Sequence, residues 1–171
     1  MTLATWLTFF LACWAISISP GPGALSAMSA GLKYGFARGY WNTVGLILGI
    51  LAQFMIVAVG LGAVLAASET AFTVVKFLGA GYLVYLGFKQ LRAHAAPVTL
   101  DTDEQDTASA RELVMRGMLL NLTNPKGTVF LLAVVPQFVD PSQPLMQQYA
   151  VLAGSLAFTD IVVMGVYTLL A

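Results

Sequence analysis

Charged side chains are scarce in this sequence. They make up 9% of its 171 residues, whereas 58% are hydrophobic, and the mean hydropathy is +0.82. Soluble domains carry about 25% charged residues. No Asp, Glu, Lys or Arg occurs from Met1 to Leu32 or from Gly39 to Ser68. Because uncharged apolar runs of about 18 or more residues predict bilayer-spanning helices, we expect an all-α integral membrane protein solvated mainly by lipid.

The residue types that metal sites and hydrolytic enzymes need are equally scarce. Cys13 is the only cysteine and His94 the only histidine, so neither a disulfide within the chain nor a zinc cluster can form. Acids are rare within the apolar runs, which argues against export of a metal ion. The net charge is zero and no basic patch with interleaved aromatic residues occurs. We therefore expect no cofactor, no enzymatic activity and no nucleic-acid partner. An intramembrane enzyme is the rival class that these absences disfavour.

The apolar runs predict about five transmembrane helices. Residues 1–92 would hold three of them, and residues 112–171 would hold two. Residues 93–111 between them form a polar linker with a proline and four acids. The chain ends on an apolar segment without a charged residue to anchor it, so we expect a sixth helix to be missing. The predicted spans are Leu3–Leu25, Tyr40–Ala67, Thr70–Leu91, Glu112–Val139 and Gln147–Ala171.

Lysine and arginine are concentrated in the first and third connections between these spans. The second and fourth connections are almost free of positive charge. Because cytoplasmic loops carry an excess of Lys and Arg, the first and third loops should be cytoplasmic and the N-terminus outside. The residues concerned are Lys33, Arg38, Lys89, Arg92, Arg111 and Arg116.

Two of the predicted spans contain a helix-breaking segment. The first has Ser19 followed by Pro20, Gly21, Pro22 and Gly23, and the fourth has the run from Asn121 to Lys126, with Asn124 and Pro125. Proline cannot donate a backbone hydrogen bond, so the carbonyls freed at each break need other partners. In a bilayer such backbone is tolerated only against protein or a water-filled cavity. Paired breaks in matching helices of two three-helix sets predict the substrate site of an inverted-repeat transporter.

Two ionisable residues are expected near mid-bilayer. Lys126 lies 14 positions after Glu112, and Asp160 lies near the middle of the fifth span. Charges at this depth are costly and therefore indicate function. Two interpretations remain open for the pair. They form a static salt bridge, or Lys126 attracts a substrate carboxylate while Asp160 attracts its ammonium or carries a proton.

Small residues at helical spacing predict close packing between helices. Gly45 and Gly49 form a Gly-x-x-x-Gly pair in the second span, and Gly79, Gly81 and Gly87 lie in the third. Such residues let two backbones approach each other in a membrane.

Three motifs together resemble the LysE/RhtB family of bacterial amino-acid exporters. They are Ser19–Pro22 (SPGP), Leu78–Gly87 (LGAGYLVYLG) and Gly117–Pro141 (GMLLNLTNPKGTVFLLAVVPQFVDP), in this order along nearly the whole chain. Members usually carry Asp or Asn where this chain has Gly23, which removes a polar side chain from the first break. Members also run about one helix longer.

The resemblance implies six helices in two inverted three-helix repeats, of which this chain lacks the last. It implies proton-driven efflux of amino acids or derivatives across the bacterial inner membrane by a multi-pass protein, with homoserine, homoserine lactone and threonine as the favoured branch. The expected partners are an amino-acid substrate, protons and lipid, and assembly into a homo-oligomer is left open. The alternative is a non-transporting membrane subunit or a degenerate fragment.

Overall fold

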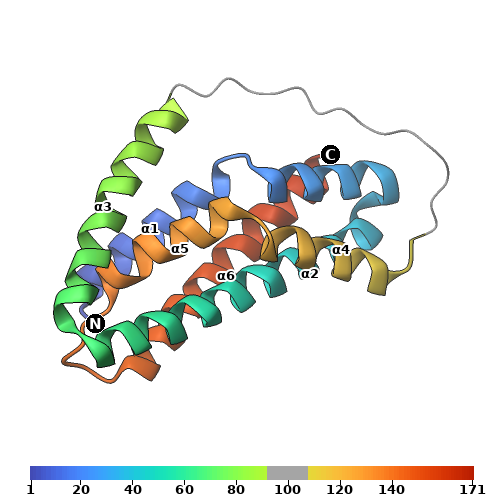
Figure 1. Ribbon diagram of the computed structural model, residues 1–171. Coiled ribbons are helices and arrows are strands. Elements are labelled where there is room, and N and C mark those ends of the chain that lie inside the picture. Colours follow the sequence, from blue (N-terminus) through green and yellow to red (C-terminus); the bar gives the residue numbers. More distant parts are fainter. Residues whose placement is uncertain (92–107) are drawn as a thin grey trace.

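Every element in the part of the chain that the computed structural model describes, residues 1–91 and 108–171, is an α-helix (Figure 1). The helices confirm an all-α protein. Most of the predicted linker at 93–111 lies outside the described residues. The helices are α1 (Leu3–Ile18), α2 (Pro22–Ala67), α3 (Glu69–Leu91), α4 (Ala110–Leu122), α5 (Pro125–Phe138) and α6 (Leu145–Leu170).

The predicted end of the first span at Leu25 is wrong. Helix α2 starts at Pro22 and stays helical to Ala67, except at Gly35, where φ is 72° and ψ is 166°. The Ala, Leu, Met and Ser residues after Pro22 are all compatible with a helix, and Gly35 makes the turn alone, in a conformation open almost only to glycine. Gly35 divides α2 into a first arm, residues 22–34, and a second arm, residues 36–67. Figure 1 shows α1 and the first arm end to end, with the second arm running back beside them.

The predicted interruption of the fourth span is confirmed. Helix α4 ends at Leu122, α5 begins at Pro125, and the two are bent by 57°. The third and fifth spans match α3 and α6, whose ends lie within two residues of the predicted ones.

The number of spans stays a prediction. Within the described residues, α2 and α6 are long and apolar enough to cross a membrane, and α4 with α5 would count as one more if the bent pair is a single span. Helix α1, with 16 residues, is apolar but shorter. These helices fit a membrane protein without fixing five spans or a 3+3 repeat.

Glycines bring α2 and α4 into backbone contact. A Cβ built on Gly45 would lie 2.1 Å from the Val114 carbonyl oxygen, and one on Gly49 would lie 2.7 Å from the Met118 oxygen. The predicted role of this glycine pair is therefore confirmed. Across the interface, Gly117 of α4 approaches α2 in the same way.

Of the three glycines predicted to pack closely in α3, one lies against a neighbouring helix and one does not. A Cβ on Gly79 would lie 2.7 Å from the Ala133 Cα of α5, which confirms a close approach there. The prediction is wrong for Gly81, which has nothing within 4 Å of a built Cβ. Gly87 lies outside the residues whose side-chain surroundings are described.

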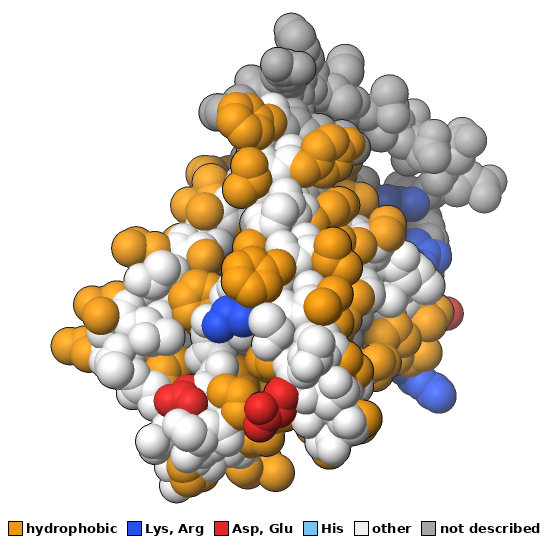
Figure 2. Space-filling view, turned by 60° about the vertical axis from the view of Figure 1, so that its left-hand side comes forward, with side chains coloured by type: hydrophobic (Ala, Val, Ile, Leu, Met, Phe, Trp, Pro, Cys, Tyr) orange, Lys and Arg blue, Asp and Glu red, His pale blue; other side chains and the backbone are white. Residues whose placement is uncertain are grey.

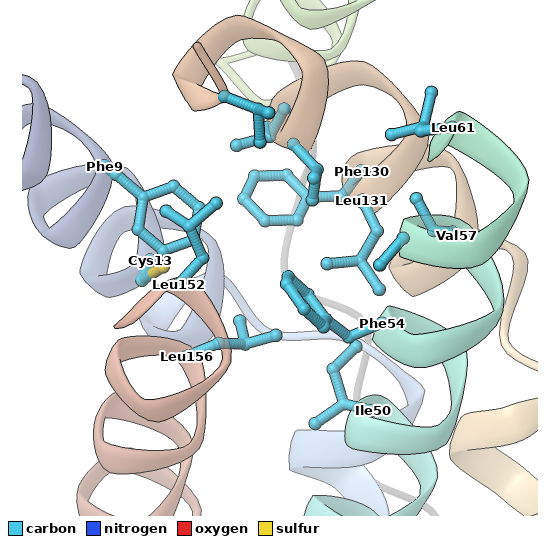
Figure 3. Packing of buried hydrophobic residues seen from close by; sticks show 14 of the residues in the cluster. Phe9, Cys13, Ile50, Phe54, Val57, Leu61, Phe130, Leu131, Leu152 and Leu156 are labelled. Carbon is cyan, nitrogen blue, oxygen red and sulfur yellow. The ribbon is translucent and has the colours of Figure 1, made fainter. Parts of the chain in front are cut away.

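The buried core gathers side chains from several helices around one apolar cluster (Figure 3). Phe9 of α1, Phe54 of α2, Leu131 of α5 and Leu152 of α6 are fully buried in it. Cys13 is buried in the same cluster as Phe9. Burial of this cluster fixes α1, α5 and α6 around the second arm of α2.

The outer surface is largely apolar. Figure 2 shows hydrophobic side chains over much of one face, with few charged groups among them. Leu3 is 71% exposed and Phe77 is 73% exposed. Such a surface matches lipid as the main solvent, as the composition predicts.

Candidate functional site

The first break lies between α1 and α2, and its freed carbonyls are bound by side chains from elsewhere in the chain. Ser19, Pro20 and Gly21 are non-helical, and Pro22 is the first residue of α2, where a missing N–H costs nothing. Tyr167 Oη of α6 donates to the Ile18 carbonyl at 2.7 Å. The Ser19 carbonyl accepts from Lys126 Nζ at 3.1 Å. The two predicted breaks therefore meet through Lys126.

The second break is built from Thr123 and Asn124, between α4 and α5. Pro125 takes the first position of α5, and Asn124 Oδ1 accepts from the Lys126 N–H at 3.0 Å and caps the helix. Asn121 uses its amide for a structural contact, because its Nδ2 donates to the Leu46 carbonyl of α2 at 2.7 Å. Gln53 of α2 holds the carbonyls at this break.

Lys126 reaches from the second break into the first. Its Nζ donates to Ser19 Oγ at 3.0 Å as well as to the Ser19 carbonyl. A Cβ on Gly21 would lie 3.2 Å from this Nζ, so the absence of a side chain at Gly21 leaves room for the ammonium group. Both partners are neutral oxygens, which a carboxylate oxygen could replace as acceptors for the same ammonium.

Asp160 is buried in α6 and is bound to α1. It is 9% exposed, and its Oδ1 accepts a hydrogen bond from Ser17 Oγ, itself 5% exposed. No ion pair joins Asp160 to Lys126 in the described part of the chain; each is held by a different serine near the C-terminal end of α1. The salt-bridge interpretation therefore does not describe this conformation.

A small cavity lies between the two breaks. Its volume is about 70 Å³, and its lining includes Ile50, Phe130 and Leu156, which also belong to the apolar core. This volume has room for water but is well below the roughly 300–1,000 Å³ of typical ligand pockets. In this conformation the cavity is therefore too small to hold an amino acid.

Six of the nine predicted site residues line this cavity. They are Gly21, Gly23, Asn121, Asn124, Lys126 and Asp160. Pro20, Pro22 and Pro125 are not among its lining residues; the three prolines lie in the first break and at the starts of α2 and α5. The sequence thus locates the two polypeptide segments that meet, and the prolines shape the backbone around the cavity.

Ser17 and Gln53 are absent from the sequence prediction, and Ser19 is named there only as part of the first break. Neither serine is predicted to bind a charged side chain, because serine is common in membrane helices and the partners lie more than 100 residues away. Gln53 gives a better signal, since it is the only amide side chain between Asn42 and the end of α2. Within the described residues, no group of three or more Cys, His, Asp or Glu side chains is placed to hold a metal ion.

Known proteins match this chain along most of its length. The family model for the LysE type translocator matches residues 14–171. A homoserine/homoserine lactone efflux protein of Salmonella typhimurium is 39% identical over the whole chain and 82% of its own length. An uncharacterized membrane protein of Vibrio cholerae has the same identity and coverage.

A more distant relative carries a different substrate in its name. A leucine efflux protein of Klebsiella pneumoniae is 31% identical over 79% of this chain and 63% of its own length. No solved structure matches the chain. The motifs at the two breaks, the apolar helices and these matches agree, and the chain belongs to the LysE-type translocator family.

Proposed function

We propose that this protein exports amino acids or close derivatives across the bacterial inner membrane by proton-coupled alternating access. Homoserine and its lactone are the first substrates to test, because relatives that match the whole chain carry those names. The observation that carries the proposal is the contact between the two breaks, in which Lys126 Nζ binds Ser19 at the cavity that both residues line. Access would alternate as the two breaks move relative to each other.

Lys126 supplies the group that recognises an acid or carbonyl oxygen of the substrate. When the cavity opens, a carboxylate would take the place of the Ser19 oxygens at Nζ, exchanging neutral acceptors for a charged one. The bonds to Ser19 already have a charged donor, and a carboxylate acceptor adds the attraction between two opposite charges. Binding of the substrate would therefore stabilise a state in which the two breaks are no longer tied together.

Asp160 supplies a carboxyl group, whose charge when ionised is opposite to that of the Lys126 ammonium group. It lines the same cavity, and its Oδ1 is bound by Ser17. A carboxylate there would bind the substrate ammonium in one state and a proton in another, which links export to the proton gradient.

The first test compares Lys126→Gln with Lys76→Gln in cells loaded with homoserine-containing dipeptides. Lys76 lies in α3, and the contact made there is by its backbone carbonyl, which accepts from Gln137, so its side chain is a fair control. We expect Lys126→Gln to lower homoserine release at least about tenfold, the effect of losing a charged hydrogen bond worth about 1.5–3 kcal/mol. Lys76→Gln should release homoserine at the unsubstituted rate at equal protein level.

Loading a second set of cells with homoserine lactone allows the release of the two proposed substrates to be compared. Homoserine has a free carboxylate, whereas its lactone offers only an ester carbonyl to Lys126. Lys126→Gln should therefore reduce homoserine release more than lactone release. Unchanged release of both would remove Lys126 from the mechanism, and release of neither by the unsubstituted protein would favour a non-transporting membrane subunit.

A further inference from the structure

Gln53 joins the second arm of α2 to the break between α4 and α5. Its side chain is 3% exposed, and Nε2 donates to the carbonyl oxygens of Leu122 at 3.1 Å and Asn124 at 3.2 Å, and to Thr128 Oγ1 at 2.7 Å. These acceptors lie before, within and after the break. One amide group therefore contacts both helices whose mutual angle is 57°.

At the break, the Leu122 carbonyl has no main-chain donor within the described residues. In a continuous α-helix, the Leu122 carbonyl would accept from the Lys126 N–H four residues later. Here that N–H donates to Asn124 Oδ1 instead. Pro125 has no N–H, and the Asn121 carbonyl accepts from the Asn124 N–H at 3.0 Å. The Gln53 amide thus takes the place of the missing Lys126 N–H on Leu122.

The position of Gln53 along α2 explains how it reaches the break. Gly45, Gly49 and Gln53 follow at four-residue intervals and so share one face of α2. The two glycines hold that face against the α4 backbone at Val114 and Met118. One turn further along, where α4 ends, Gln53 meets open carbonyls instead of a continuous helix.

The orientation of the amide follows from its surroundings. Gln53 Oε1 is buried and has no hydrogen-bond partner in the described part of the chain. Turning the amide over would place this oxygen against the Leu122 and Asn124 carbonyl oxygens, which cannot donate. The donor side is therefore fixed by the break, and the acceptor side points toward Gly127, where a built Cβ would lie 2.6 Å from Oε1.

We infer that Gln53 is a positioning residue for transport: it fixes the angle between α4 and α5 and thereby aims Lys126 at the first break. The inference rests on the proposed function for its effect on transport, but its effect on the angle can be measured separately. Loss of the amide would leave the Leu122 carbonyl without a donor, and the break would take other angles. Lys126, the second residue of α5, would then no longer meet Ser19 in one fixed geometry.

The experiment measures the angle directly. Spin labels are attached to cysteines at Met115 of α4 and Leu132 of α5, both on exposed surface, in a Cys13→Ala background. Distances between the labels are measured by pulsed electron resonance in lipid nanodiscs. We expect Gln53→Leu to shift or broaden the distance distribution. Thr43→Val, which removes the buried hydrogen bond to Thr168 elsewhere on α2, should leave it unchanged.

A second variant tests the same contact without removing the Gln53 side chain. Gly127→Ala keeps the amide but pushes its flexible end away from the break, and we expect the same change in the distance distribution in a folded protein. In transport assays, both variants should lower the maximal rate about tenfold while KM changes less than about twofold, as expected for lost positioning rather than lost binding.

The outcomes separate the two proposals. An unchanged distance distribution in folded Gln53→Leu or Gly127→Ala protein would overturn the role of Gln53, whether or not the protein transports. A changed distribution together with no transport by the unsubstituted protein would overturn the proposed function and leave the role of Gln53 in the angle intact.

Discussion

At the scale of single residues, two serines bind the two ionisable side chains of the cavity separately. Ser17 donates to Asp160, and Ser19 accepts from Lys126, although the serines are only two positions apart in the chain. Each ionisable group thus has a neutral partner, which a ligand would replace in the proposed mechanism. A direct salt bridge would instead have to be broken before either group could bind substrate.

Asp160→Asn tests the proton step at this scale. Asparagine keeps the size of the side chain and an oxygen that can accept from Ser17, but it takes up no proton and carries no charge. In inside-out membrane vesicles, we expect homoserine uptake driven by a pH gradient to fall at least about tenfold. Gradient-driven uptake at the unsubstituted rate would exclude Asp160 as the proton carrier.

Asp140→Asn is the matched control for this change. Asp140 is exposed in the loop between α5 and α6, and hydrogen bonds from the Ser142 side chain and backbone lower its pKa below the ordinary value. It is therefore fully charged at neutral pH, so its substitution removes the same charge outside the site. Uptake by Asp140→Asn should match that of the unsubstituted protein.

The sequence predicts the charged residues of the site better than their partners. Lys126 and Asp160 stand out because a charge inside an apolar run demands an explanation. Ser17 and Gln53 do not, because the atoms they bind belong to helices distant in the chain, and no local pattern encodes that proximity. The prolines are recognised correctly as breaks, although none of them lines the cavity.

At the scale of helices, glycine determines which pairs can pack backbone to backbone. Gly117→Ala should destabilise the protein by about 1–3 kcal/mol, the usual effect of overpacking, because its Cβ would lie 2.1 Å from the Asn42 carbonyl oxygen. The measurement is the midpoint of unfolding by SDS of protein purified in mild detergent.

Gly60→Ala provides the contrast within α2. A built Cβ there has nothing within 4 Å, so the added methyl group meets no neighbour. Because glycine is worse than alanine in a helix by about 1 kcal/mol, Gly60→Ala should leave stability equal or slightly higher. Equal destabilisation by the two substitutions would show that the α2–α4 contact does not depend on Gly117.

The helices also show where hydropathy stops being informative. The sequence correctly indicates where α3 and α6 start, since α3 begins at Glu69 and α6 directly follows Pro144. Hydropathy fails after Pro22, because an apolar segment that turns back through one glycine looks the same as one that ends in a loop. The turn at Gly35 depends on a single dihedral angle, which composition does not record.

At the scale of the whole molecule, the helix bundle has two ends that differ in their content of Lys and Arg. The N-terminal residues Met1 and Thr2 share a cavity wall with Gln143 and Pro144 of the α5–α6 loop. At the other end, Arg38 donates to the Ala108 carbonyl at the start of the second half. The excess of Lys and Arg at that end predicts that it faces the cytoplasm.

Cysteine labelling tests this orientation. In a Cys13→Ala background, a cysteine at Thr2 or Gln143 should react with a membrane-impermeant maleimide added to intact cells with a permeable outer membrane. A cysteine at Phe36, next to the Gly35 turn and 45% exposed, should react only after the inner membrane is opened. The reverse pattern would contradict the predicted orientation.

The turn at Gly35 has a consequence for how mutations in this protein should be read. Without it, the 46 residues of α2 would form one rod about 69 Å long, roughly twice the thickness of the hydrocarbon layer. The chain would then leave α2 on the opposite side of the membrane, and every later segment would be inserted in the reverse orientation. A change at Gly35 is therefore expected to act as a fault in membrane insertion, which a transport assay alone would not distinguish from the loss of Lys126.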